Sequence, residues 1–442
     1  GRIRKETSSS VLSNSPLRIG IAGLGTVGAG TIKLLEQQAS LIAMRCGREI
    51  TVTAVSARDR SKDRGVDLAG FNWHDDPVAL ASDDSVDVVA ELIGGEDGPA
   101  KDLVEAAIAN GKHVVTANKA LIAHHGTALA KSAEAANVAV AFEAAVAGGI
   151  PIVKALREGL AANTISRVFG ILNGTCNYIL SEMRETGKEF DVVLKEAQEL
   201  GYAEADPAFD VDGVDAAHKL AILTSLAFGC ELNFDAVHIE GIRHISPLDI
   251  EFAEDLGYRI KLLGIARQTD KGIEQRVHPC MVPLDAPIAH IEDVFNAVVA
   301  DGDFVDTTMY EGRGAGEGPT ASAVVADIID IARGRMPNTF AIPADNLAKM
   351  QEAPISSHVG SYYVRFMVAD KPGVFATIAG ALHEHNVSME AVLQRGRSEN
   401  EAVPVVLTTH EADEASMVAT LDAIAKNDAV VEPPRLIRIE SF

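Results

Sequence analysis

A glycine-rich turn between an apolar strand and an amphipathic helix constrains the fold of this chain most strongly. The segment RIGIAGLGTVGAGTIKLL contains the pattern G-x-G-x-x-G in this strand–turn–helix context. The first glycine permits a tight turn, the second lets the backbone approach a pyrophosphate, and the third lets the helix pack on the strand. A second apolar run at residues 50–55 follows at the spacing of a βαβ unit, which predicts a Rossmann dinucleotide-binding domain. The residues expected at the phosphates are Gly23, Gly25, Thr26, Val27 and Gly28.

The end of the second predicted strand bears on the choice between NAD and NADP. An NAD-specific domain usually places Asp or Glu there to bind the ribose hydroxyls, but this chain has Ser56, Ala57 and Arg58. An arginine at this turn can bind the 2′-phosphate of NADP. We therefore expect NADP as the cofactor. NAD remains an alternative, because Arg58 could be a surface charge and Asp59 could turn toward the ribose.

Two further predicted strands, at residues 86–93 and 113–115, are each followed by a polar loop. In a parallel sheet, ligands bind beyond the carboxyl ends of the strands, so both loops should lie beside the cofactor. For the lysine in the second loop, the alternative is a surface residue at the end of a helix. The residues expected on the nicotinamide side are Gly94, Gly95, Asn118 and Lys119.

An acid-rich segment, GYAEADPAFDVDGVDAAHKL, leads into a predicted helix. Asp215 and Lys219 are four residues apart, so a helix at residues 214–224 places them on one face. Carboxylates can hold a substrate ammonium, and a lysine can supply a proton or stabilise an oxyanion. The alternative is a solvated acidic loop with an ordinary helical ion pair. The candidate substrate-binding acids are Glu204, Asp210 and Asp215.

Together these motifs resemble the homoserine dehydrogenase family, in its bacterial form with a C-terminal ACT domain. The resemblance runs from about Pro16 to the end, and further segments that carry it are TANKALIA, FEAAVAGGIPI, GILNGTCNYIL and GRGAGEGPTASAVVADI. It implies the reversible NAD(P)H-dependent reduction of L-aspartate 4-semialdehyde to L-homoserine, a step of threonine and methionine biosynthesis. The implied fold is α/β, with a Rossmann domain, an α+β catalytic and dimerisation domain, and an ACT domain of βαββαβ order.

The resemblance also assigns roles to individual residues. It implies that Lys219 donates the proton, that Lys119 lies between cofactor and substrate, and that Glu204 and Asp215 bind the substrate. The residues that would contact the nicotinamide side of the cofactor are Gly201 and Gly316. The implied ligands of a structural monovalent cation, expected to be sodium, are Glu143 and the backbone carbonyls of Val146, Gly148 and Ile150.

The C-terminal part of the chain has the pattern of a separate small domain. Predicted strands at residues 362–368, 387–394 and 403–410 surround a helix at 374–385, which resembles the ACT fold. Such domains bind amino acids at the loop before the first helix, usually across a pair of domains. We expect L-threonine as the effector, with a purely structural dimerisation module as the alternative. The expected effector-site residues are Asp370, Gly373, Val374 and Asn386.

These observations divide the chain into five parts. The proline-containing linker suggests that the last part could be removed without rebuilding the catalytic core. We expect an enzyme that acts on a small-molecule substrate and forms a homodimer or homotetramer. The parts are residues 1–15, a disordered tail or expression remnant; 16–149 with a returning segment 312–335, the Rossmann domain; 150–311, the substrate, catalytic and dimerisation domain; 336–360, the linker; and 361–442, the ACT domain.

Composition limits the partners and the location. The formal net charge of −24 disfavours nucleic acid and anionic membranes as partners. No apolar run approaches the roughly 20 residues that a membrane span needs, and no signal peptide is evident. The four cysteines show no metal-ligand or C-x-x-C spacing, so we expect reduced thiols in a cytoplasmic protein.

Two other functions remain open from the sequence. A phosphorylating semialdehyde dehydrogenase needs a nucleophilic cysteine with a histidine base, and Cys176 is the only candidate for that nucleophile. Its apolar flanks favour packing over catalysis. A sensor that binds nucleotide and amino acid without turnover is the other alternative, but it would have no use for a proton donor such as Lys219.

Overall fold

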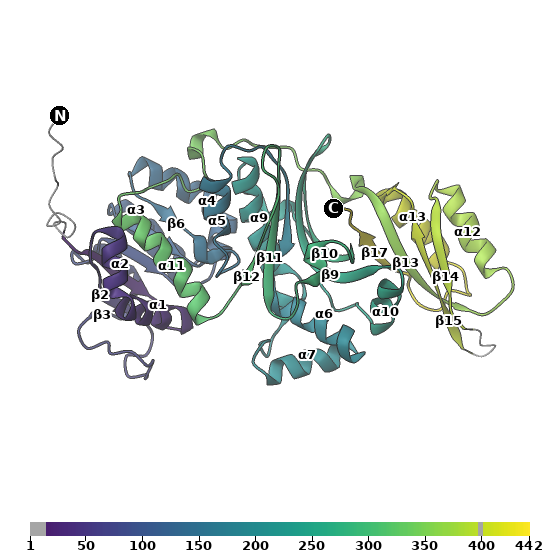
Figure 1. Cartoon of the computed structure of the whole chain (residues 1–442), viewed down its shortest axis with the longest axis horizontal. Coiled ribbons are helices and arrows are strands. Elements are labelled where there is room, and N and C mark those ends of the chain that lie inside the picture. The colour runs from purple at the N-terminus through teal and green to yellow at the C-terminus, as the bar shows by residue number, and fades with distance from the viewer. Residues whose placement is uncertain (1–14, 397–400) are drawn as a thin grey trace, which may run out of the picture. The chain divides into compact units, whose positions relative to one another are not determined.

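The computed structural model describes residues 15–396 and 401–442 (Figure 1). Most of the predicted N-terminal tail, up to residue 14, lies outside the described residues. The chain forms two compact units, and strand β7 and helix α9 contribute to both. The first holds the chain up to Val168 with His218–Asp235 and Asn296–Met350. The second holds Phe169–Ala217, Ala236–Phe295 and Gln351–Phe442.

The first unit contains a parallel sheet of six strands in the order β3-β2-β1-β4-β5-β6. This is the order of a Rossmann dinucleotide-binding fold, so the predicted fold of this domain is confirmed. The strands are β1 (Leu17–Ala22), β2 (Ile50–Ser56), β3 (Asn72–His74), β4 (Val88–Glu91), β5 (His113–Thr116) and β6 (Val140–Ala141). The helices around it are α1 (Thr26–Gln37), α2 (Ala39–Cys46), α3 (Pro99–Ala109) and α4 (Lys119–Ala135).

The core of this sheet explains why the chain returns to it late in the sequence. Ile19 and Ile21 of β1 are fully buried, as expected for a central parallel strand with both faces covered. Helix α11 (Glu317–Ala332) packs Val324 and Ile328 into the same apolar cluster. Helix α11, about 300 positions after β1, therefore completes this apolar cluster. It lies within the segment 312–335 that the family resemblance expects to return to the Rossmann domain.

The remaining elements of the first unit are shorter or lie on a second sheet. Strands β12, β11 and β7 are neighbours in that order. The segment that follows α11 is packed rather than extended into solvent, since Phe340 and Ala344 are buried. The elements are α5 (Ile152–Lys154), a π-helical turn (Ala155–Gly159), β7 (Ile165–Ile171), β11 (Phe295–Gly302) and β12 (Asp306–Arg313).

The second unit begins with helices and a long hairpin. Strands β9 and β10 pair in antiparallel register along their full length, and the short strand β8 pairs with β10. The helices are α6 (Gly174–Thr186), α7 (Phe190–Glu199), α8 (Ala208–Val211), α9 (Val214–Phe228) and α10 (Pro247–Asp255). The strands are β8 (His238–Ile239), β9 (Tyr258–Thr269) and β10 (Gly272–Pro283).

The tail has the predicted βαββαβ order, which confirms the ACT fold. Its sheet runs β17-β13-β15-β14, and α12 and α13 belong to the same fold (Figure 1). Tyr362, Phe366 and Leu407 form its apolar core with Ile378 of α12 and Met417 of α13. The elements are β13 (Val359–Ala369), α12 (Val374–Glu384), β14 (Met389–Gln394), β15 (Ala402–Thr409), β16 (Ala412–Asp413), α13 (Glu414–Ala425) and β17 (Arg435–Ile439).

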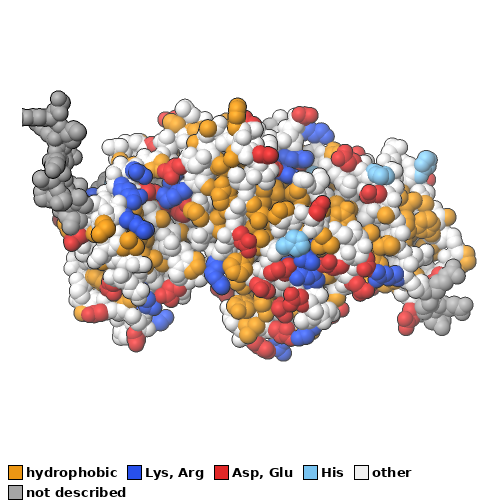
Figure 2. Space-filling model, viewed as in Figure 1, with side chains coloured by type: hydrophobic (Ala, Val, Ile, Leu, Met, Phe, Trp, Pro, Cys, Tyr) orange, Lys and Arg blue, Asp and Glu red, His pale blue; other side chains and the backbone are white. Residues whose placement is uncertain are grey.

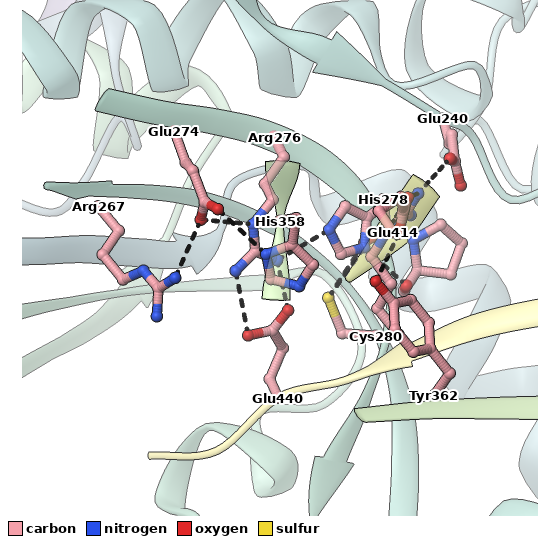
Figure 3. Close-up of polar contacts among 12 residues, drawn as sticks. Glu240, Arg267, Glu274, Arg276, His278, Cys280, His358, Tyr362, Glu414 and Glu440 are labelled. Carbon is pink, nitrogen blue, oxygen red and sulfur yellow. Dashed lines mark hydrogen bonds and ion pairs between the residues drawn. The ribbon is translucent and has the colours of Figure 1, made fainter. Parts of the chain in front are cut away.

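The last strand of the tail joins the sheet of the β9–β10 hairpin. β17 pairs in parallel with β10, with Cys280 opposite Arg438 and Met281 opposite Ile439. A buried polar cluster surrounds this pairing, and in it Arg276 bonds Glu440 (Figure 3). The pairing does not fit the expectation that the tail could be removed without rebuilding its neighbours.

The surface carries charges of both signs. On the face shown in Figure 2, Lys and Arg side chains are interspersed with Asp and Glu. Among the described residues, no helix combines the length and the apolar composition that crossing a bilayer requires.

Candidate active site

The predicted phosphate-binding turn follows β1 and leads into α1. Gly23 has φ +93°, and a Cβ there would lie 2.5 Å from the carbonyl oxygen of Leu92. A Cβ on Gly28 would lie 1.9 Å from the carbonyl oxygen of Gly23. Gly25 instead faces open space and precedes α1 without a side-chain cap. The turn thus leaves the start of α1, where Thr26 and Val27 lie, open to an anionic group such as a pyrophosphate.

A basic pocket adjoins this turn at the end of β2. The pocket has a volume of about 590 Å³, and its lining includes Gly25, Arg58, Lys62 and Arg64. The carboxylate of Asp59 accepts hydrogen bonds from the backbone N–H and the hydroxyl of Ser61, at 3.0 and 2.8 Å. The carboxylate of Asp59 therefore stabilises the turn in which it lies. The charged side chains that line the pocket are mainly basic.

Lys62 and Arg64 were missed by the sequence analysis. The segment RDRSKDRG directly follows the second strand, and its density of basic residues was the signal that could have found them. A side chain several residues beyond a strand reaches back to the strand's end only if the loop folds over it. That folding is a property of the tertiary structure.

A buried carboxylate holds the two loops that were predicted to face the nicotinamide. Glu91, at the end of β4, accepts a hydrogen bond from the N–H of Gly94 at 3.0 Å and one from the hydroxyl of Thr116 at 2.9 Å. The Asn118 amide donates to the carbonyl of Gly95 at 2.6 Å. The structure therefore brings the predicted residues Gly94, Gly95 and Asn118 together. Glu91 itself was missed, although an acid that ends an apolar strand is an unusual core residue.

Lys119 is the first residue of α4, and its side chain is half-buried. The Asn118 side chain caps this helix by accepting the N–H of Leu121 at 3.0 Å. A cation at a helix N-terminus faces the positive end of the helix dipole, which disfavours it. Helix stability therefore does not explain Lys119, which directly follows the residue that bonds Gly95.

Glu143 lies in the turn predicted to hold a monovalent cation, but its carboxylate has other partners. The backbone N–H groups of Val153 and Lys154 donate to it at 2.9 and 3.2 Å. Burial, together with the nearby carboxylate of Asp327, raises the pKa of Glu143 to about 7. The backbone carbonyl of Glu143 accepts the N–H of Val146 at 3.5 Å, which leaves one lone pair of that oxygen for a cation.

The other predicted cation ligands lie in a tight turn. Ala147 and Gly148 both have positive φ, +53° and +27°, which turns successive carbonyls to different sides. No described residue donates a hydrogen bond to the carbonyls of Val146 and Gly148, whereas the carbonyl of Ile150 accepts the N–H of Ile152 at 2.8 Å. Carbonyl oxygens are hard donors of the kind that small cations prefer, and each has two lone pairs.

In the second unit, two of the predicted substrate acids are held together. The side-chain amide of Asn173 donates to Asp210 and to Asp215, both at 2.8 Å. Asp215 is buried and lies in the first turn of α9, which confirms the predicted helix. Lys219 lies four residues further along α9, so the two side chains leave the same face of the helix.

The other acids of the segment are arranged differently. Glu204 lies in the turn between α7 and α8 with its side chain exposed. Asp206 accepts the N–H of Ala208 at 3.2 Å, and Asp212 forms an ion pair with Arg243 at 2.6 Å. Asp206 and Asp212 therefore stabilise the loop.

Two glycines predicted near the nicotinamide have positive φ. Gly201 follows α7 with φ +80°, and Gly316 precedes α11 with φ +109°.

Cys176 does not have the setting of a nucleophile. It is fully buried in α6, its N–H donates to the side chain of Asn173 at 2.8 Å, and its thiol contacts the carbonyl of Asp210 at 3.2 Å. An attacking thiolate needs access to substrate and a polar environment that favours ionisation. The structure therefore favours packing as the role of Cys176.

The ACT tail has a pocket of its own before α12. The pocket has a volume of about 580 Å³, and its lining includes Asp370, Lys371, Gly373 and Val374. Three of the four predicted effector-site residues are thus brought together. Asn386 lies beyond the opposite end of α12. Asn386 does not line this pocket.

Comparisons with known proteins agree on one family. Residues 23–143 match the model for the homoserine dehydrogenase NAD-binding domain, residues 151–329 the model for homoserine dehydrogenase, and residues 362–429 the model for the ACT domain. A homoserine dehydrogenase of Neisseria gonorrhoeae is 49% identical over 434 residues, which is 97% of this chain and 99% of that protein.

Solved structures give the same result. A homoserine dehydrogenase from Thiobacillus denitrificans has a TM-score of 0.91 and 47% identity, covering 97% of this chain and 99% of that one. A hyperthermophilic archaeal homoserine dehydrogenase, solved in complex with NADPH, has a TM-score of 0.63 and 26% identity, covering 73% of this chain and 99% of that one.

Proposed function

Since the chain belongs to the homoserine dehydrogenase family and is an NAD(P)-dependent oxidoreductase that acts on a CH–OH group, we propose roles for its residues in the reversible reduction of L-aspartate 4-semialdehyde to L-homoserine. The observation that carries the proposal is helix α9. It presents a buried carboxylate, Asp215, and an amine, Lys219, one turn apart.

Lys219 is the proton donor in the proposed mechanism. The bound nicotinamide supplies the hydride for the aldehyde carbon. Lys219 protonates the oxygen as its negative charge develops, and in the reverse direction the neutral amine takes the hydroxyl proton. Lys119 adds positive charge at the end of β5, where the sheet positions its loop.

Glu204, Asp210 and Asp215 are the proposed substrate-binding acids. Carboxylates form strong charge-assisted hydrogen bonds with an ammonium, and the substrate is a zwitterionic amino acid. The support is the pair of acids joined by Asn173. Consumption of L-aspartate 4-semialdehyde with NADPH should need no phosphate; a phosphate requirement for oxidising this aldehyde would instead indicate a phosphorylating dehydrogenase.

NADP is the proposed cofactor. The support is the pocket at the end of β2, in which Arg58, Lys62 and Arg64 offer positive charge where a 2′-phosphate would bind. The archaeal relative solved with NADPH is consistent with this choice. Gly201 and Gly316 would approach the nicotinamide side. Sodium is proposed as a structural cation, held by the carbonyls of the Glu143 turn. The support is that no described residue donates a hydrogen bond to the carbonyls of Val146 and Gly148.

Arg58→Ala is expected to lower kcat/KM for NADP several-fold and to leave the value for NAD nearly unchanged, because only NADP carries the phosphate that Arg58 would bind. Steady-state rates with each cofactor measure the effect. The matched control is Arg60→Ala, since Arg60 instead stacks over Trp73 at 5.6 Å. Equal losses with NAD and NADP for the Arg58 variant would show that Arg58 supports the fold and does not bind the phosphate.

L-Threonine is the proposed effector, bound in the pocket before α12. The pocket offers Asp370 for an ammonium, and Lys371 with the start of α12 for a carboxylate, which suits a free amino acid. We also propose a homodimer or homotetramer, in which Asn386 would complete the site from a second copy. The domain boundaries that the sequence predicts are part of the proposal: the Rossmann domain at residues 16–149 and 312–335, the catalytic and dimerisation domain at 150–311, the linker at 336–360 and the ACT domain at 361–442.

A cytoplasmic location is proposed as well, supported by four cysteines that form no disulfide in the described chain.

Asp370→Ala is expected to raise the threonine concentration needed for half-inhibition, because the variant loses the carboxylate that would bind the effector's ammonium. Typical allosteric coupling gives roughly five- to 150-fold control, so the shift should be measurable in initial rates at increasing threonine. Asp422→Ala, an exposed acid on α13 outside the pocket lining, serves as the control. Unchanged inhibition of the Asp370 variant would place threonine elsewhere.

A further inference from the structure

Asn173 connects the start of helix α6 to the acids of the proposed substrate site through hydrogen bonds. It precedes α6, and its side-chain oxygen accepts the N–H of Cys176 at 2.8 Å. Its side-chain nitrogen donates to Asp210 and to Asp215, both at 2.8 Å. Asn173 is only 6% exposed and Asp215 only 4%, so solvent contributes little to this arrangement.

We propose that Asn173 is a positioning residue for the reaction, which holds the carboxylates of Asp210 and Asp215 at a fixed separation. The proposal rests on the assignment of these two acids to the substrate site. A side-chain amide has two N–H groups, and here each is used by a different carboxylate. Asn173 therefore joins a residue of α8 to a residue of α9 through a single rigid planar group.

The orientation of this amide is fixed from both sides. If the oxygen and nitrogen exchanged places, the oxygen would face two carboxylates and the nitrogen would face the N–H of Cys176, and all three contacts would be repulsive. Helix α6 is itself anchored, because the amide of Asn177 donates to the carbonyls of Ile291 and Asp293 at 3.0 and 2.9 Å. The two acids are thus tied to a rigid helix.

The need for such a group follows from electrostatics. Two carboxylates that approach one another repel, and a carboxylate as buried as Asp215 loses most of its hydration. A neutral donor between them reduces both costs without cancelling the negative charge. A lysine or arginine in its place would neutralise one carboxylate and compete with the substrate ammonium. An asparagine therefore suits a pair of acids whose charge is kept for a ligand.

Replacements at position 173 separate the two functions of the side chain. Asn173→Ser keeps an oxygen that can cap α6 but removes both amide donors. Asn173→Asp keeps the cap and the shape but places a third carboxylate beside Asp210 and Asp215. Both variants are expected to raise KM for homoserine by about tenfold or more, because hydrogen bonds to charged groups are the stronger ones. The Asp variant should be affected more, and NADPH affinity should be unchanged in both.

Asn177→Ala is the matched control, since Asn177 is a buried amide on α6 that donates to backbone carbonyls and accepts from Lys261, and none of these partners is a proposed substrate acid. It should lower the midpoint of thermal unfolding and leave KM for homoserine near the wild-type value. If one of the Asn173 variants does not fold, the other still tests the proposal. NADPH binding, measured by fluorescence, identifies a folded variant.

The outcomes distinguish this proposal from the proposed function. A wild-type chain that does not oxidise homoserine would refute the proposed function. An active wild type whose folded Asn173→Ser or Asn173→Asp variant keeps normal KM and kcat would refute the positioning role alone. Equal changes in KM for the Asn173 and Asn177 variants would also refute it, because the effect would then be one of general stability.

Discussion

Lys219→Ala is expected to lower kcat at least about a hundredfold, which is the scale of a lost general acid–base group. The methyl group of alanine can neither protonate the forming alkoxide nor take the hydroxyl proton in the reverse direction. Cofactor affinity should persist, because the phosphate-binding turn and the basic pocket are built from β1, β2 and α1. Steady-state turnover and NADPH binding, measured on the same preparation, give both quantities.

Lys131→Ala provides the control for removing a lysine from the same unit. Lys131 lies on α4 and pairs with Glu231 at 3.4 Å, with 44% of its side chain exposed. Such exposed pairs contribute little, so kcat should stay near the wild-type value. If the Lys219 variant also kept a near-normal kcat, Lys219 would not be the proton donor.

Arg276→Met is expected to lower the unfolding free energy of the second unit by about 3 to 5 kcal/mol, the typical effect of removing one partner from a buried ion pair. Arg276 is 2% exposed on β10 and bonds Glu440, the residue that follows β17 (Figure 3). Its removal leaves the buried carboxylate of Glu440 without this cation at the pairing of β10 with β17. Calorimetric or denaturant unfolding measures the loss.

Arg395→Met is the matched comparison, because Arg395 also connects the tail to a neighbouring element. It bonds Glu251 at 2.9 Å and also pairs with Asp255, both on α10, and its guanidinium lies over the ring of Phe252, but the three charged side chains are well exposed. The expected loss is about 1 kcal/mol or less. Equal destabilisation by the two replacements would contradict a special contribution from the buried pair.

The fold was predictable wherever the sequence signal is local. Gly23 is required by its positive φ and Gly28 by its close approach to Gly23, and both requirements arise within one strand–turn–helix unit, so the motif reports them directly. The spacing of Asp215 and Lys219 likewise depends only on α9 being a helix. The βαββαβ order of the tail follows from short alternating and periodic segments. For these elements the residues near in sequence are also the residues in contact.

Contacts between distant segments could not be predicted in the same way. The parallel pairing of β10 with β17 joins Cys280 to Arg438, and nothing near either residue signals the other. The prolines of the linker suggested a removable tail, but ending the chain near Pro354 would expose the edge of β10 and remove Glu440 from Arg276. Point changes in the pocket before α12 are therefore the sounder test of regulation.

In the candidate site, too, local patterns were predictable from the sequence and contacts between distant residues were not. Sequence patterns predicted Asn118, Asp210 and Asp215, but not the residues that hold them. Glu91 joins the loops after β4 and β5, and Asn173 joins two acids 37 and 42 positions away. A positioning residue is recognisable only when its partners are seen together. In a sequence, each of these side chains is one polar residue at the end of an apolar strand.

The most direct test is the initial rate of change at the nicotinamide absorbance band when L-homoserine and NADP are added to the wild-type chain. We predict homoserine-dependent NADP reduction without added phosphate, and a slower or weaker reaction with NAD. A chain that binds NADP but reduces neither cofactor with homoserine would contradict catalysis by Lys219, and would indicate a protein that binds nucleotide and amino acid without turnover.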